Sequence, residues 1–407
     1  MIKRCPKTIY LDHAASTPLD LVVKKVMKVS EDKLFANPSA ITKEGVEARK
    51  AIEEARDKVA RLLFAHSDEI IFTGSGTESD ALAILGTINH YLSENKTAIP
   101  HIVTTTIEHP AVLENCKLLE KEGKARVTYV SCEENGIISP KEIKKALQPD
   151  TILVSVMYAN NEIGTVQPIQ EIAKEIRHFR KQQTSAFPFF HTDAAQAMNY
   201  LPTENIEKLG VDLLSFNSSK IYGPKGVGIL FKKRGITLAP LYRGGGQENN
   251  LRSGTENTIS IIGASVAFEE ACRRKEKESA RLSKIRDYAI EKILHLSETS
   301  GYTIVLNGDP VNRLPNNINV SISNISSELL VIELDARGIE VSAKSACKAE
   351  DPEESYVIRA LQTARGFDSK STDGSLRISL GRATTQKDMD AFVSALEMIL
   401  VTYKQWE

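Results

Sequence analysis

The sequence carries almost no net charge and has no long apolar run. Its 407 residues include 52 Lys and Arg against 53 Asp and Glu, a formal net charge of -1. Such a balance argues against a dedicated nucleic-acid binder, whose affinity depends on basic side chains that neutralise phosphates. No segment reaches the ~20 consecutive apolar residues of a membrane helix, and residues 1–6 lead into polar sequence without a secretory apolar core. We therefore expect a cytoplasmic protein whose partners are small molecules or proteins, not nucleic acid or a membrane.

Cysteine is scarce, odd in number and scattered. None of the five cysteines forms a CxxC pair, which argues against a disulfide framework and against a tetrahedral zinc site. We expect no metal site. The five are Cys5, Cys116, Cys132, Cys272 and Cys347.

The composition is otherwise ordinary, with 41% hydrophobic residues, and the length suits a large core with a second domain attached. Between residues 69 and 231, short apolar runs alternate with amphipathic stretches, which is typical of an α/β fold with a mainly parallel sheet. The predicted strands are residues 70–72, 101–105, 127–130, 152–157, 187–191, 213–216 and 227–231.

From about residue 273 the pattern changes to a charged helix at 275–296 followed by shorter alternating segments. This indicates a smaller α+β domain. We expect residues 1–15 to join that smaller domain, residues 16–260 to form the large domain, and residues 261–407 to form the smaller one.

A glycine-bearing turn, FTGSGTE at residues 72–78, lies between a predicted strand and a predicted helix. Backbone N–H groups at a helix start favour a phosphate. Alone, the segment is equally compatible with an ordinary tight turn. Neither a GxxxxGK[ST] nor a GxGxxG motif follows, so a P-loop or Rossmann nucleotide site has no support.

Asp193 and Lys220 follow two successive predicted strands, where open α/β sheets form their ligand crevice. Either residue taken singly suits a salt bridge. With the phosphate turn, however, they supply the three groups that pyridoxal phosphate (PLP) needs: a lysine, a carboxylate and an anion site. His109, just after the strand 101–105, could lie over a flat ring, although a surface histidine would also fit there.

Two further residues belong to the predicted smaller domain. Cys347 lies in a loop-like segment between Lys344 and Lys348, whose charges favour the nucleophilic thiolate. Arg377 lies in a predicted strand, and its planar guanidinium would suit a substrate carboxylate if it faced the crevice.

These motifs, in their order, resemble those of the cysteine desulfurases of the NifS/IscS type, which share the class V aminotransferase fold. The resemblance extends over nearly the whole chain, from YLDHAASTP at 10–18 to RISLGR at 377–382. The intervening matches are NNEIG at 160–164, TDAAQ at 192–196, KIYGPKG at 220–226, GGGQE at 244–248, RSGT at 252–255 and SAC at 345–347. It implies a PLP enzyme of fold type I, in which the large domain binds the cofactor and the smaller one carries the Cys347 loop.

The resemblance also implies roles around the cofactor ring. Lys220 matches the lysine that binds PLP covalently, Asp193 the partner of the ring nitrogen, and Gln196 the donor to the ring hydroxyl. His109 matches the residue stacked on the ring and is expected to take part in catalysis.

The remaining roles concern phosphate and substrate. Gly76 and Thr77 match the phosphate cradle, and Thr255 matches a contact made by the other subunit of a homodimer. Asn160 and Arg377 match the positions that hold the substrate carboxylate, and Asn160 is also expected to contact the cofactor.

The chain departs from the family pattern just before Lys220. Where relatives commonly have Ser-Gly-His, this chain has Asn217, Ser218 and Ser219. The imidazole is missing, but asparagine and serine side chains can donate hydrogen bonds, so we expect Asn217 and Ser219 to contact the cofactor. Lys344, near Cys347, replaces a usual glycine.

The activity implied by the resemblance is conversion of L-cysteine to L-alanine. The sulfur would be held as a persulfide on Cys347 and passed to an acceptor or IscU-like scaffold protein for iron-sulfur cluster assembly or tRNA thiolation. Two alternatives stay open: a selenocysteine lyase or other β-eliminating PLP enzyme, and a catalytically silent scaffold homologue.

Overall fold

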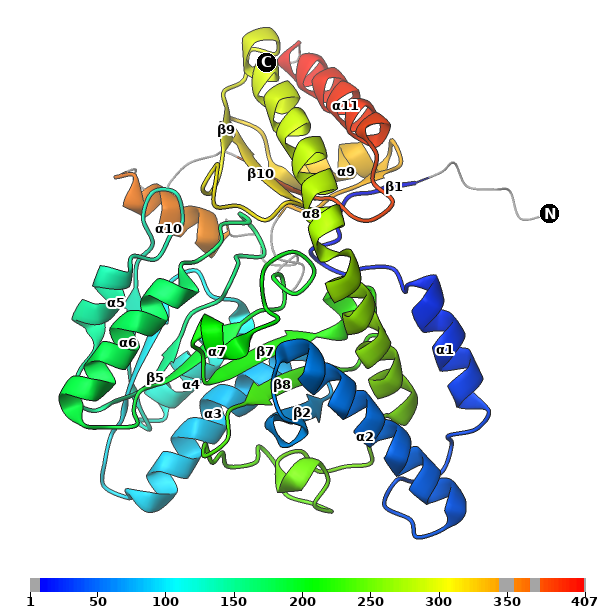
Figure 1. Ribbon diagram of the computed structural model, residues 1–407. Coiled ribbons are helices and arrows are strands. Elements are labelled where there is room, and N and C mark those ends of the chain that lie inside the picture. Colours follow the sequence, from blue (N-terminus) through cyan, green and yellow to red (C-terminus); the bar gives the residue numbers. More distant parts are fainter. Residues whose placement is uncertain (1–7, 344–354, 367–373, 406–407) are drawn as a thin grey trace.

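The computed structural model describes residues 8–343, 355–366 and 374–405. Figure 1 shows a large lower region built around one sheet and a smaller upper region, with one long helix running through both. Cys5, Lys344, Cys347 and Lys348 lie outside the described residues.

The sheet of the large region has seven strands in the order β2-β8-β7-β6-β5-β3-β4. All pairs are parallel except those of β8, which runs antiparallel to β7 and β2. The strands are β2 (Ile70–Thr73), β3 (His101–Thr105), β4 (Arg126–Val130), β5 (Thr151–Ser155), β6 (Phe189–Asp193), β7 (Leu213–Asn217) and β8 (Gly228–Lys232). The α/β class with a mainly parallel sheet is therefore confirmed.

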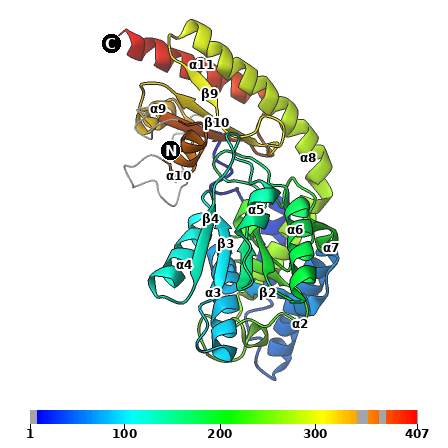
Figure 2. The ribbon, with the colours of Figure 1, turned by 90° about the vertical axis from the view of Figure 1, so that its left-hand side faces the viewer.

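Helices cover both faces of this sheet (Figure 2). In β2, Ile71 joins one apolar cluster with α3 and α4, whereas its neighbours Ile70 and Phe72 join another with α2 and α6. Successive side chains of a strand point to opposite faces, so the continuously apolar strands are buried on both sides. The helices of this region are α1 (Leu21–Glu31), α2 (Lys43–Leu63), α3 (Gly76–Glu94), α4 (Pro110–Lys121), α5 (Pro140–Ala146), α6 (Ile169–Gln183) and α7 (Ile206–Leu209).

The smaller region has a three-stranded antiparallel sheet in the order β12-β10-β9, packed against helices. A short strand β1 (Ile9–Tyr10) pairs with β11 (Ile339–Glu340), so the N-terminal segment runs along this region. The other elements are β9 (Ile304–Leu306), β10 (Asn317–Ile322), α9 (Ser327–Asp335), α10 (Tyr356–Ala364), β12 (Gly374–Ser379) and α11 (Gln386–Lys404).

The helix α8 (Thr258–Thr299) is 42 residues long and connects the two regions. Ile261 and Phe268 in its first half pack into the core of the large region, whereas Leu282 and Ile293 pack into the core of the smaller one. A boundary at residue 261 therefore falls too early, because the passage from one core to the other lies within α8 beyond Phe268. Within the described part of the chain, no helix is long and apolar enough to cross a membrane.

Candidate active site

A cavity of about 150 Å³ opens at the carboxyl ends of β6 and β7. Its walls come from both regions of the molecule, because the N-terminal segment and β12 contribute to it as well. Eight residues predicted from the sequence line this cavity: Gly76, Thr77, His109, Asp193, Gln196, Asn217, Lys220 and Arg377.

The start of α3 forms one wall. Ser75 caps the helix by accepting a hydrogen bond from the Glu78 N–H at 3.1 Å, and Gly76 and Thr77 follow in the first turn. A Cβ atom on Gly76 would lie 2.9 Å from Asn217 Nδ2, so glycine permits the close approach of that amide. Unpaired N–H groups and the helix dipole favour an anion at such a point.

Asp193 and Lys220 lie on a second wall. Asp193, the last residue of β6, accepts a hydrogen bond from the Ala195 N–H at 2.8 Å. Burial raises the pKa of Asp193 to about 6, while the Ala195 N–H and the charge of Lys220 act in the opposite direction. Lys220 Nζ donates to the carbonyls of Ala14 and Ala15 at 2.8 and 2.5 Å. The N-terminal segment thus holds the lysine at the edge of the cavity.

Gln196 is held by the same segment, since its Nε2 donates to the Ala14 carbonyl at 3.0 Å. Its place in the cavity lining, on the turn after β6, puts its amide on the side of Asp193 and Lys220.

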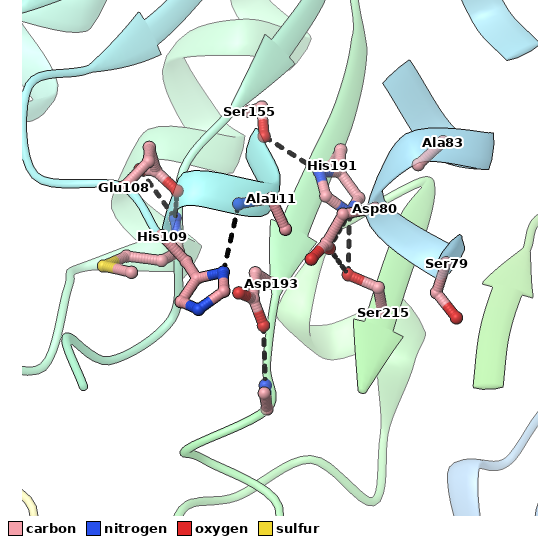
Figure 3. Close-up of polar contacts among 12 residues, drawn as sticks. Ser79, Asp80, Ala83, Glu108, His109, Ala111, Ser155, His191, Asp193 and Ser215 are labelled. Carbon is pink, nitrogen blue, oxygen red and sulfur yellow. Dashed lines mark hydrogen bonds and ion pairs between the residues drawn. The ribbon is translucent and has the colours of Figure 1, made fainter. Parts of the chain in front are cut away.

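His109 caps α4 from the third wall. Its Nδ1 accepts a hydrogen bond from the Ala111 N–H at 3.1 Å, so the proton of the neutral ring lies on Nε2. Burial and the charge of Lys220 lower the pKa of His109 to about 4, and the imidazole is therefore neutral at physiological pH. Figure 3 shows its ring next to the Asp193 carboxyl group.

Arg377 reaches the cavity from β12 of the smaller region. It is 1% exposed, and it donates to Asp12 Oδ1 at 2.7 Å and to the Asn161 carbonyl at 3.2 Å. Among the described residues, its Nε has no hydrogen-bond partner. A buried arginine that lines a cavity and keeps one N–H unpaired is suited to a carboxylate.

The structure differs from the expectation for Asn160. Its side chain is fully buried and turned into its own loop: Nδ2 donates to the Ile107 carbonyl, and Oδ1 accepts from the N–H groups of Glu162 and Ile163. The next residue, Asn161, lines the cavity instead, and its buried Oδ1 has no hydrogen-bond partner in the part of the chain that the structure describes. The sequence offered two adjacent asparagines, and the tight turn decides which one faces the ligand.

Three other expected residues are not in the lining. Ser219 contacts Thr17 through its backbone carbonyl, and Thr255 is exposed on the loop before α8. Cys347 lies outside the described residues.

Asp80 is a lining residue that the sequence reading missed. It belongs to the TESD segment at 77–80, which looks like an acidic first turn of a helix. Asp80 lies in the second turn of α3, on the side that faces the sheet, and this position brings it to the cavity.

The polar groups left unpaired here fit PLP. Buried Asn161 Oδ1, Asn217 Oδ1 and Arg377 Nε all lack partners within the described structure. The cavity also offers the three groups that this cofactor requires. These are the start of α3 for the phosphate, Asp193 for the ring nitrogen and Lys220 for the aldehyde.

Comparisons with known proteins agree with this chemistry. The family described as aminotransferase class-V matches residues 9–392. The chain is 44% identical to a "Cysteine desulfurase IscS" of Dictyoglomus turgidum over 97% of this chain and 95% of that protein. It is 41% identical to the protein of that name from Methanosarcina thermophila, over 97% and 92%.

Solved structures give the same result. A "NifS-like protein" superposes with a TM-score of 0.86 at 34% identity, over 97% of this chain and 99% of that one. A structure titled "SspA in complex with cysteine" has a TM-score of 0.74 at 34% identity, over 92% and 99%. The chain therefore belongs to the class-V aminotransferase family and, within it, to the PLP-dependent cysteine desulfurases of the NifS/IscS type.

Proposed function

We propose that this protein converts L-cysteine to L-alanine and transfers the sulfur, as a persulfide, to another protein. The observation that carries the proposal is that Lys220, Asp193, His109 and Arg377 line the same cavity, and that Arg377 Nε is unpaired within the described structure. This arrangement joins a cofactor site to a site for the carboxylate of an amino acid.

The lining residues hold the two ligands in distinct ways. Lys220 would bind the cofactor covalently, Asp193 would face its ring nitrogen and Gln196 its ring hydroxyl. Gly76, Thr77 and Asn217 would hold the phosphate at the start of α3. When bound, PLP supplies an electron sink for the charge that develops at the substrate Cα.

The side chains then supply orientation and proton transfer. Arg377 and Asn161 would hold the substrate carboxylate, which fixes the Cα proton relative to the Lys220 amine. That amine would accept the Cα proton. The neutral His109 can exchange a proton through Nε2, because its Nδ1 is engaged with Ala111.

We assign sulfur transfer to Cys347, which remains a prediction from the sequence. Its thiolate would attack the substrate sulfur, forming an S–S bond while the Cβ–S bond breaks. The electron pair of that bond stays with the substrate carbon, which takes up a proton to become alanine. No external oxidant or reductant is needed.

The partners are also part of the proposal. We expect a homodimer in which Thr255 reaches the phosphate site of the other subunit, and its exposed position agrees with such a contact. An IscU-like scaffold or another acceptor would take the sulfur for iron-sulfur clusters or tRNA thiolation. We expect this chemistry in the cytoplasm, and cell fractionation would test that location.

One experiment tests the proposal: L-cysteine is added to wild type, to Cys347→Ala and to the control Cys272→Ala, and alanine, sulfide and protein persulfide are measured. We expect persulfide and alanine in wild type and in the control, because burial raises the pKa of Cys272 to about 11 and keeps it an unreactive thiol. Cys347→Ala should form neither at the wild-type rate.

The same experiment separates the alternatives. Sulfide without protein-bound persulfide would indicate a β-eliminating enzyme. A purified protein that neither binds PLP nor consumes cysteine would indicate a silent homologue. Equal persulfide formation by Cys347→Ala would show that another residue accepts the sulfur.

A further inference from the structure

A chain of buried polar side chains lies beneath the cavity and uses none of the groups assigned above to cofactor or substrate. It runs through Ser155 on β5, His191 on β6, Ser215 on β7 and Asp80 on α3 (Figure 3). His191 Nδ1 lies 2.8 Å from Ser155 Oγ, its Nε2 lies 3.0 Å from Ser215 Oγ, and Ser215 Oγ donates to Asp80 Oδ1.

The direction of these hydrogen bonds follows from the donors available. With the proton of the Asp80 carboxyl group on Oδ2, Ser215 gives its single proton to Asp80 Oδ1, and His191 then donates from Nε2 to Ser215 Oγ. His191 Nδ1 is then an acceptor and receives the proton of Ser155. His191 is fully buried, and burial lowers its pKa to about 3, so the ring is neutral and this tautomer is fixed by its two serines.

Asp80 and Asp193 meet the same cavity but have different surroundings. Asp193 accepts a backbone N–H and feels the charge of Lys220. Among the described residues, the basic group within ion-pair distance of Asp80 is the His191 ring at 3.6 Å, which is neutral, and no lysine or arginine pairs with Asp80. A buried carboxylate without a cation is costly, so of these two acids Asp80 is the one that should carry a proton.

We propose that Asp80 is a positioning residue for Asp193: anchored by Ser215 and His191 as an uncharged acid, it leaves Asp193 as the anion that holds the cofactor ring nitrogen. Burial and the nearby Asp193 raise the pKa of Asp80 well above its usual range, in agreement with this arrangement. The inference rests on the proposed function, because it concerns how the cofactor site is kept ready for a protonated ring.

Three other ionisable groups lie around Asp80. Glu108 precedes α4, His109 caps its start, and Lys220 lies on the other side of Asp193. Glu108 is a useful control. It is fully buried and accepts from Thr105 Oγ1 and from the Met157 N–H, and burial raises its pKa to about 8. It should therefore also be protonated at neutral pH, but it has no contact with Ser215 or His191.

Infrared spectroscopy of the purified full-length protein at pH 7 tests the proposal directly. A protonated carboxyl group has a C=O stretching band that a carboxylate lacks. Asp80→Asn should remove one such band, and Glu108→Gln should remove a different one. Ser215→Ala should shift the Asp80 band to higher frequency and leave the Glu108 band in place, because it removes the hydrogen bond to Asp80 Oδ1.

Titration with PLP supplies the second readout. Asp80→Asn keeps an uncharged side chain of the same shape, so its Kd for PLP should stay within about threefold of wild type. Asp193→Asn should weaken binding by about 100-fold, the loss of a charge-assisted hydrogen bond. Conservative replacement thus distinguishes the two acids.

Two results would overturn the inference: an unchanged carboxyl region in Asp80→Asn, which would mean that Asp80 is ionised, or a loss of PLP affinity in that variant as large as in Asp193→Asn. Failure of the proposed function looks different. Wild type would then bind no PLP, while the infrared bands would still report the state of Asp80.

Discussion

The cavity has two sides of different origin. The ring side consists of Asp193, His109 and the start of α3, all placed by the large region at the carboxyl ends of its strands. The carboxylate side is assembled from three separate segments: Arg377 on β12, Asp12 beside the paired strand β1, and Asn161 on the loop after β5.

This difference separates two tasks. The ring side is built on the sheet and helices of the large region, with the N-terminal segment holding Lys220 and Gln196, so cofactor binding should depend mainly on the fold of the large region. The carboxylate side exists only where the two regions meet, because Arg377 is held by Asp12 from the N-terminal segment and by a carbonyl of the large region. Substitutions on the two sides should therefore affect different measurements.

The largest effect is expected on the ring side, for Lys220→Ala. The variant should lose activity by about 10⁴-fold or more, since it loses both the covalent anchor of the cofactor and the amine that takes the proton. The absorbance of the cofactor and the initial rate of alanine formation measure it. Lys225→Ala, an exposed lysine of the same KIYGPKG segment, is the matched control and should behave as wild type. Activity within tenfold of wild type would contradict the assignment of Lys220.

On the carboxylate side, Arg377→Ala should raise KM for L-cysteine by about 10- to 100-fold, which corresponds to the loss of a hydrogen bond to a charged group. The cofactor spectrum should not change, because no ring-side contact is lost. Arg377→Lys keeps the charge but not the planar guanidinium group, so its KM should lie between those of wild type and Arg377→Ala. A variant that loses its cofactor as well would show that the two sides are not independent.

Most residues of the ring side could be predicted from the sequence. Asp193 and Lys220 follow short, mainly apolar runs, which are typical of buried strands, so both residues are expected at the carboxyl ends of strands. The sequence could not choose between Asn160 and Asn161, since the direction of each side chain depends on the backbone of one turn. It also did not reveal Asp80 as a lining residue, because burial against the sheet is not visible in the helix pattern of residues 77–80. The first half of α8 escaped prediction for the same reason: Ile261 and Phe268 are buried by tertiary packing.

The two asparagines allow a sharper comparison. Asn161→Ala should raise KM by about tenfold with little change in stability, because its Oδ1 has no partner in the described structure. Asn160→Ala should instead lower the free energy of unfolding by about 2–3 kcal/mol, since it leaves the buried N–H groups of Glu162 and Ile163 unpaired. Steady-state kinetics and urea unfolding measure the two effects. A raised KM for Asn160→Ala, with a loss of stability for Asn161→Ala, would show that Asn160 is the residue that binds the substrate carboxylate.

The smallest effect is a pH dependence confined to the ring side. The pKa of Asp193 is raised to about 6, so the carboxylate is lost as the pH falls below that value. Its attraction for a protonated ring nitrogen is fully present above about pH 7, and affinity for PLP should fall by up to about tenfold per pH unit below pH 6. His109 adds nothing between pH 5 and 8, because its pKa of about 4 keeps it neutral there. Glu108, with a pKa of about 8, stays protonated over the range below pH 6 in which Asp193 loses its charge.

The phosphate of the cofactor titrates near the same pH, so the Kd of wild type alone cannot isolate Asp193. The ratio of Kd values for Asp193→Asn and wild type removes that contribution, because both proteins bind the same phosphate. We expect this ratio to be about 100 above pH 7 and to fall to about 10 near pH 5, where about one tenth of Asp193 remains ionised. A ratio that stays constant from pH 5 to 8 would mean that the charge of Asp193 does not hold the ring. Asp193 would then not belong to the ring side of the cavity.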